Sequence, residues 1–175
     1  MADFMTAFRW TMQFEDPRMA CEEVPDAAPA GVSGPCYAIS GINSGAWPAE
    51  FSAIAALRRA ERSPAVEAFY EKHFWNRWLA ELASDDLAKR VFDFAVNGGS
   101  GTAVMTLQRA VNSLGGDLKV DGGWGARTVA EANAQDQAEV AEAFIAARVV
   151  HYEAIAAAHP ADAKFLKQWL VRARS

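Results

Sequence analysis

The chain has 175 residues, of which 51% are hydrophobic and 22% are charged, and its formal net charge is −5. This composition predicts one folded domain and excludes a disordered chain. The acidic balance, without a run of Lys or Arg, argues against a nucleic-acid partner, and no apolar run is long enough for membrane insertion.

Apolar residues recur at helical spacing in about eight segments, which predicts a mainly helical, all-α fold. The first helix spans Asp3 to Gln13, before Pro17. Ser63 is a suitable N-cap for a later helix, with Pro64 at its first position. The remaining helices are predicted over residues 48–62, 63–78, 84–98, 102–114, a short stretch from 128, 136–158 and 163–174.

Residues 18–48 have no helical period and are rich in proline and glycine, so we expect loops with a small β-hairpin. The best strand candidate runs from Cys36 to Ser40. Two cysteines, Cys21 and Cys36, flank this segment. A disulfide between them and a pair of free thiols are both compatible with the sequence.

The stretch from Asp93 to Thr128 contains eight of the twelve glycines. Glycine clusters between helices mark turns of fixed geometry. Within this stretch Asn97 and Gln108 offer polar groups, and Trp124 offers an aromatic face. Each also has a purely structural interpretation, as a helix end, an exposed helical residue or a cover for the glycine turn.

The residue types favour carboxylate chemistry over the alternatives. The three histidines are far apart, without other ligands at metal spacing, so no metal site is predicted. Neither a nucleophile elbow nor a phosphate-binding glycine motif is present. Two carboxylates across a bond can cleave a glycoside. Glu15, at the end of an apolar helix, suits the acid, and Asp26 is the leading partner, with Glu22 and Glu23 as alternatives. Glu22, Glu23 and Asp26 also fit a solvated acidic loop.

Several spaced motifs resemble family 108 glycoside hydrolases, which are lysozyme-like muramidases of the phage-endolysin type with a C-terminal predicted peptidoglycan domain. The motifs are Asp93 to Asn97 with the following glycines, Leu107 to Ala110, Asp121 to Thr128 and Phe165 to Arg172. The resemblance implies one lysozyme-like domain, with a catalytic-motif half over residues 1–62 and a peptidoglycan-domain half over 63–175.

The same resemblance places Glu15 at the catalytic glutamate of a Glu-Gly-Gly-Tyr motif. Here Asp16-Pro17-Arg18 replaces Gly-Gly-Tyr. A later Tyr-Gly-Ile-Ser motif is matched from Tyr37 to Ser40, with alanine in place of glycine. Tyr37, Ser40, Asn97, Gln108 and Trp124 are therefore expected to contact substrate.

Two functions follow from these expectations. One is hydrolysis of peptidoglycan glycan strands, with Glu15 as the general acid. The other is an inactive lysozyme-like module that binds peptidoglycan or a protein. No cofactor is implied, and a monomer is expected. The N-terminus lacks signal-peptide features, so we expect synthesis in the cytoplasm and action in the periplasm or at the cell wall.

Overall fold

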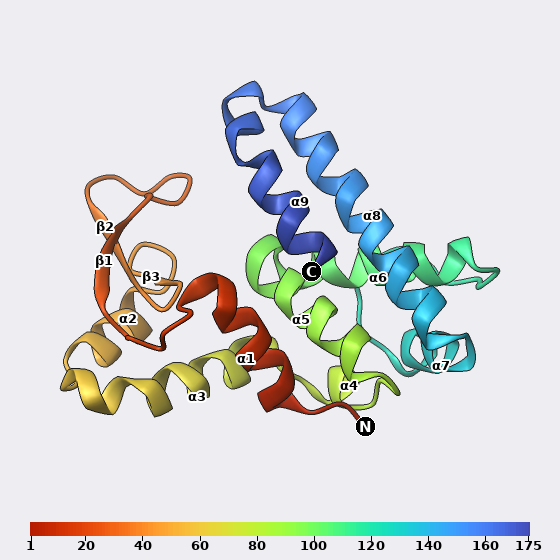
Figure 1. The fold of residues 1–175 in the computed structure, drawn as a ribbon, viewed down its shortest axis with the longest axis horizontal. Helices are drawn as coiled ribbons and strands as arrows, with labels where there is room; N and C mark the ends of the chain where they lie inside the picture. The colour runs from red at the N-terminus through yellow and green to blue at the C-terminus, as the bar shows by residue number, and fades with distance from the viewer. The chain divides into compact units, whose positions relative to one another are not determined.

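The computed structural model describes all residues from 1 to 175 (Figure 1). Nine α-helices, two 3-10 helices and one three-stranded antiparallel sheet make up the fold, which confirms the predicted helical class with a small hairpin region. The elements in chain order are α1 (Phe4–Glu15), β1 (Glu23–Asp26), β2 (Cys36–Ile39), β3 (Ile42–Asn43), α2 (Pro48–Ala55), η1 (Arg59–Glu61), α3 (Arg62–Phe74), α4 (Arg77–Ala80), α5 (Asp85–Gly98), α6 (Ser100–Ser113), α7 (Ala126–Ala134), α8 (Gln137–Ala158), η2 (Pro160–Phe165) and α9 (Leu166–Arg174).

The chain forms two compact units. Residues Phe8–Trp75 form the first, which we call the sheet unit. Residues Met1–Ala7 and Asn76–Ser175 form the second, which we call the helical unit. The boundary between them falls after α3, whereas the sequence predicted two halves that divide before this helix. The reason is that α3 packs on α2 and η1, which belong to the sheet unit.

In the sheet unit, β2 is the central strand and pairs antiparallel with both β1 and β3. The turn from β2 to β3 lies at Ser40 and Gly41, whose φ angles are 47° and 80°. Two successive left-handed residues are what a tight two-residue hairpin requires. Beneath the sheet, the rings of Phe8 from α1 and Tyr70 from α3 pack with centroids 5.7 Å apart. This packing places the last turn of α1 beside the hairpin.

In the helical unit, α5 is the central element and packs on α4, α6 and α8. Figure 1 shows α8 and α9 side by side, and the two helices contact each other along the hairpin that η2 closes. A charged group lies in this core: Asp93 of α5 is fully buried, and its carboxylate accepts hydrogen bonds from Arg148 of α8 at 2.7 Å and Arg172 of α9 at 2.8 Å. None of the helices has the length and apolar character needed to cross a bilayer.

Several predicted helix boundaries are wrong, mostly where a cap or a break in the helix lies at another residue than the sequence pattern indicates. The helix after Pro48 ends at Ala55, because residues from Arg59 to Glu61 form a 3-10 turn. The next helix begins at Arg62 without a side-chain cap, so Ser63 is not its N-cap. It ends at Phe74, and a separate short helix, capped by Asn76, follows. The strand β1 contains a proline and has no apolar alternation, which explains why the sequence did not reveal it.

Replacing Asp93 with alanine should destabilise the helical unit strongly. The change leaves two guanidinium groups without their buried carboxylate, and breaking a buried ion pair on one side typically costs about 3–5 kcal/mol. The free energy of unfolding, from urea titration followed by circular dichroism, tests this. The control is Asp117→Ala, since the Asp117 side chain is fully exposed and its ion pair lies on the surface. Equal effects of the two changes would contradict a structural role for Asp93.

Candidate active site

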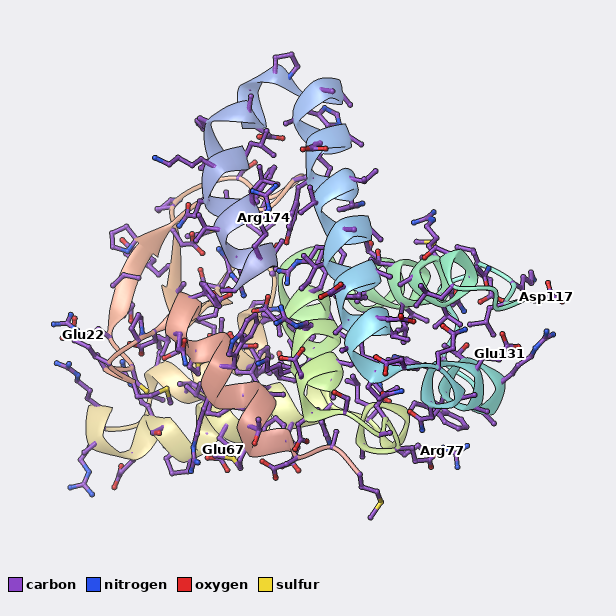
Figure 2. The ribbon with its side chains drawn as sticks, turned by 45° about the vertical axis from the view of Figure 1, so that its right-hand side comes forward. Glu22, Glu67, Arg77, Asp117, Glu131 and Arg174 are labelled. Atoms are coloured by element: carbon purple, nitrogen blue, oxygen red, sulfur yellow. The ribbon has the colours of Figure 1, made fainter.

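A cleft of about 270 Å³ lies in the sheet unit, among the end of α1, the segment that follows it and the sheet. Carboxylates dominate its charged lining: Glu15, Asp16, Glu22 and Asp26 against a single cation, Arg18. Figure 2 labels Glu22 beside the first strand. The cleft thus brings together the predicted acid, its predicted partner and one of the alternatives.

Glu15 is the last residue of α1, and its side chain is partly buried. Its carboxylate lies against the backbone of Gly41. A Cβ added to Gly41 would be 2.6 Å from Glu15 Oε2 and 2.7 Å from the hydroxyl oxygen of Tyr70. That hydroxyl donates to the carbonyl of Ser40 at 2.8 Å. The left-handed turn, without a side chain at Gly41, therefore makes room for the carboxylate of Glu15 in the cleft.

Asp16 holds the chain reversal that follows α1. Its carboxylate accepts hydrogen bonds from the backbone N–H of Ala20 at 3.0 Å and of Cys21 at 2.8 Å, and from the hydroxyl of Ser40 at 2.7 Å. Burial raises the pKa of this carboxyl, but the hydrogen bonds from Ala20, Ser40 and Cys21, with a weaker one from the N–H of Arg18, outweigh burial and leave the pKa below its ordinary value. The segment that replaces Gly-Gly-Tyr is thus tied to the β2–β3 turn.

Left-handed backbone accompanies this reversal. Met19 and Cys21 have φ angles of 47° and 49°, although neither is glycine. Residues with side chains adopt this conformation only when their surroundings enforce it, at a cost of about 1–3 kcal/mol each. The hydrogen bonds to Asp16 on either side provide that enforcement.

Asp26 ends strand β1, and its carboxylate lies at the edge of the same cleft. Asn43 of β3 donates its side-chain amide to Asp26 Oδ2 at 2.7 Å and to the carbonyl of Ala27 at 2.9 Å. The amide oxygen of Asn43 in turn accepts from the backbone N–H of Gly45 at 2.8 Å. Asn43 therefore orients Asp26. Sequence reasoning missed it, because nothing in the local pattern predicts its cross-strand position.

The two alternatives to Asp26 are less well placed. Glu22 lines the cleft but forms an ion pair with Arg59 at 2.6 Å. Glu23 is exposed and does not line the cleft. Asp26 stays the leading partner for Glu15.

Of the two cleft residues predicted on the hairpin, Ser40 lines the cleft and Tyr37 does not. Ser40 is buried, and its hydroxyl is bound to Asp16. Tyr37 pairs with Pro25, while its neighbour Ala38, which does line the cleft, pairs with Val24. Since successive side chains in a strand point to opposite faces, the side chains of Tyr37 and Ala38 lie on different faces of β2. Tyr37 therefore lies outside the lining of the cleft, and its contact with substrate stays a prediction.

Cys21 and Cys36 are both buried free thiols, so the disulfide that the sequence allowed is not formed. Cys36 pairs with Asp26 at one end of the β1–β2 ladder, and Cys21 precedes Glu23, which pairs with Ile39 at the other end. Three residues along a strand span roughly 10 Å. This exceeds the Cα separation that a disulfide tolerates, about 7 Å.

The other three predicted contacts, Asn97, Gln108 and Trp124, belong to the helical unit and do not line the cleft. Asn97 accepts a hydrogen bond from the hydroxyl of Tyr152 at 2.5 Å. Gln108 is 2% exposed and uses its whole amide on the glycine turn: it accepts from the N–H groups of residues 121 and 122, and donates to the side chain of Asp121 and the carbonyl of Gly123. The Gln108 amide therefore has no hydrogen-bonding capacity left for a substrate in this structure, and its contact with substrate stays a prediction.

Replacing Asp16 with alanine should lower the free energy of unfolding by roughly 1.5–3 kcal/mol near neutral pH, as for hydrogen bonds to a charged group. The pKa of Asp16 is depressed in the folded protein, so its stabilisation is present above the unfolded pKa of about 3.9 and is lost as the pH falls through the lower folded pKa. Urea titrations of both proteins between about pH 7 and pH 3 measure this. A difference that stays constant down to acid pH would contradict the ionised role of Asp16.

Two family descriptions match the sequence in adjoining ranges. Residues 33–99 match Glycosyl hydrolase 108, and residues 102–174 match the Predicted Peptidoglycan domain. Residues 1–32, which include Glu15 and Asp26, lie outside both ranges. No curated protein has a significantly similar sequence. Among solved structures, the fold is similar to the "Structure of Brucella abortus SagA", with a TM-score of 0.60 and 19% identity over 97% of this chain and 92% of that one. The two matches, over adjoining ranges, support membership of the glycoside hydrolase 108 family, with a predicted peptidoglycan domain as the C-terminal part.

Proposed function

We propose that this protein is a muramidase that hydrolyses the glycosidic bonds of peptidoglycan glycan strands. Glu15 is the general acid that protonates the leaving oxygen, and Asp26 is the second carboxylate. The observation that carries the proposal is that both side chains line one cleft, in a chain whose two matched families concern glycoside hydrolysis and peptidoglycan.

The surroundings of Glu15 support its role as the acid. A general acid needs a fixed position within hydrogen-bond reach of the leaving oxygen. The last turn of α1 and the bare backbone of Gly41 confine the carboxylate on two sides. The hydroxyl of Tyr70 converges on the same place, and it is itself fixed by its bond to Ser40. Glu15 therefore presents its carboxyl group from a rigid support.

The surroundings of Asp26 support a different role. Its carboxylate is exposed at the edge of the cleft and accepts a hydrogen bond from Asn43, which orients it. A second carboxylate in the cleft orients a water molecule or stabilises the positive charge that develops on the sugar. The cleft lining carries three more carboxylates than cations, which suits a neutral glycan chain better than an anionic ligand.

One observation favours the alternative of a module that binds peptidoglycan without cutting it. Arg18 lines the same cleft as Glu15, in the segment that replaces Gly-Gly-Tyr. The replacement puts a guanidinium group in the cleft where the family motif has the aromatic ring of a tyrosine. An inactive module would keep the cleft and its sugar contacts but would not release soluble fragments from cell walls.

The proposal extends to where the protein acts. Its substrate is a component of the cell wall, so we propose that the chain works there, as an endolysin of the phage type does. Cytoplasmic synthesis, a monomeric state and the phage-type origin stay predictions.

Replacing Glu15 with glutamine should lower the rate of wall hydrolysis by about 10²–10⁴-fold, because the amide occupies the same volume but cannot donate the proton. The loss of turbidity of purified cell walls, together with release of reducing sugar ends, measures this rate. Asp26→Asn should lower the rate as well. The matched control is Glu23→Gln, on the same strand as Asp26 but outside the cleft, which should leave the rate unchanged.

The alternative gives a different result in the same assay. If the wild-type protein sediments with cell walls but releases no fragments, the chain is a binding module and the muramidase proposal is lost. If Glu23→Gln is as impaired as Glu15→Gln, the cleft is not the site of hydrolysis.

Replacing Gly41 with alanine should reduce hydrolysis by about 100-fold, the typical effect of displacing a catalytic group by an ångström. The added methyl would meet the carboxylate of Glu15 at 2.6 Å. Gly31→Ala is a matched control, since Gly31 has a similar φ of 83° but no heavy atom within 4 Å of the added Cβ. Both variants place a side chain on left-handed backbone, which carries a similar energetic cost. The difference between their rates of hydrolysis therefore reports on the contact with Glu15. Equal rates for the two variants would argue against the close contact.

A further inference from the structure

The outward side of α8 carries apolar side chains that the chain's own fold leaves uncovered. Val150 of α8 is 63% exposed and Val171 of α9 is 61% exposed, and among the large hydrophobic residues only Met1 is more exposed. A hollow of about 500 Å³ lies beside them, lined by Glu142, Ile145, Ala146, Val149, Val150 and Arg174. Exposed apolar side chains that gather in one place mark an interaction surface, whereas scattered ones do not.

These side chains of α8 form one stripe along the helix. Residues three and four positions apart lie on the same face of a helix. We call this stripe the α8 face and define it by Glu142, Ile145, Ala146, Val149, Val150 and Glu153. The buried residues of the helix, such as Phe144 and Tyr152, lie on the other side and pack in the core. The α8 face is therefore what remains after the helix has packed within its own chain.

The α8 face reads nearly the same in both directions. A glutamate stands at each end, at positions 142 and 153, and branched or small apolar residues fill the four positions between them. A two-fold axis through the middle of the face would set position 145 against position 150 of a second copy, and 146 against 149. The helix has 22 residues, which is about 33 Å at 1.5 Å per residue, so the contact would be long. The apolar part of the face is thus complementary to itself.

The charged residues fit the same arrangement. The two-fold axis brings Glu142 of one copy near the partner's Glu153, where two carboxylates alone would repel each other. Arg174, labelled in Figure 2, lines the hollow together with Glu142 and so lies at this point. The side chains of Glu142, Glu153 and Arg174 form no ion pair within their own chain. Arg174 is therefore available for the partner's Glu153, which places opposite charges at both ends of the contact.

A membrane surface fits the α8 face less well than a second copy of the chain. Surface-bound helices carry Lys and Arg on the polar flanks of their apolar stripe, because lipid headgroups are often anionic. Here the two ends of the stripe are glutamates. The near-symmetric order of residues also has no role on a lipid surface, whereas an interface between identical chains requires it.

We propose that the α8 face binds a second copy of this chain, with the two α8 helices antiparallel about a two-fold axis. Ile145 packs against the partner's Val150, and Arg174 pairs with the partner's Glu153. Val171, one turn before Arg174 on α9, borders the contact. A dimer of this kind differs from the monomer predicted from the sequence, because helical spacing does not show which apolar positions the fold leaves exposed. The dimer is independent of hydrolysis at Glu15.

Sedimentation equilibrium of the full chain, over about a hundredfold range of protein concentration, tests the dimer, since association depends on concentration. The mass of the wild-type protein should rise from 19.0 kDa toward twice that value. Val150→Asp places a charge within the apolar contact and should raise the dissociation constant of the dimer at least about 100-fold, because a two-fold interface contains each change twice. Val120→Asp is the matched control, since Val120 is also exposed in the helical unit but lies outside α8 and α9. Circular dichroism establishes that each variant is folded.

An exchange of charges tests the pairing of Arg174 with the partner's Glu153. Arg174→Glu alone opposes two glutamates at both ends of the contact, and Glu153→Arg alone opposes two arginines, so each variant should be monomeric. A mixture of the two variants restores opposite charges at both ends and should sediment as a dimer.

Three results would overturn the proposal. A wild-type chain that stays at the mass of a monomer at every concentration means that another partner, such as an apolar helix of a different protein, covers the face. A dimer that Val150→Asp does not weaken uses another surface. A mixture of the two charge variants that stays monomeric excludes the antiparallel pairing.

Discussion

The cleft depends on the three hydrogen bonds that the carboxylate of Asp16 accepts. One donor comes from the β2–β3 turn, at Ser40, and two come from the backbone of the reversal after α1. Together they set where the helix stops and which way the chain turns, and so they decide that the neighbouring Glu15 lies over Gly41. Asp16 stands where the family motif has a glycine. The cleft can still form, because the hydrogen bonds to the Asp16 carboxylate hold the following backbone in a conformation that glycine would adopt freely.

The helical unit depends on charge in another way. Asp93 bridges two arginines from α8 and α9 within the buried core. Moving these groups out of water is costly, so the pairing adds little net stability compared with apolar packing. The ion pairs instead specify how the helices pack, because α5, α8 and α9 can meet in only one register without leaving a charge unpaired. The hydroxyl of Tyr152 extends the same network to Asn97.

Much of the fold follows from the sequence, because helical spacing of apolar residues reports directly on buried faces. Glu15, Asp26 and Ser40 were placed at the cleft by motif and local context. The features that the sequence does not reveal have physical causes. Strand β1 has no apolar alternation, and the face of Tyr37 depends on a register that only pairing with β1 defines. Gln108 reads as an exposed helical residue until the glycine turn closes over it. Asn43 becomes important only through a cross-strand contact with Asp26.

The two buried thiols have a further consequence for how the chain matures. Cys21 lies in the strained reversal beside Asp16, and Cys36 lies at the far end of the hairpin, with no covalent bond between them. The rim of the cleft is therefore held by non-covalent contacts. Folding of the sheet unit needs no oxidase and no disulfide isomerase, so the cleft can form at the redox potential of a reducing or of an oxidising compartment.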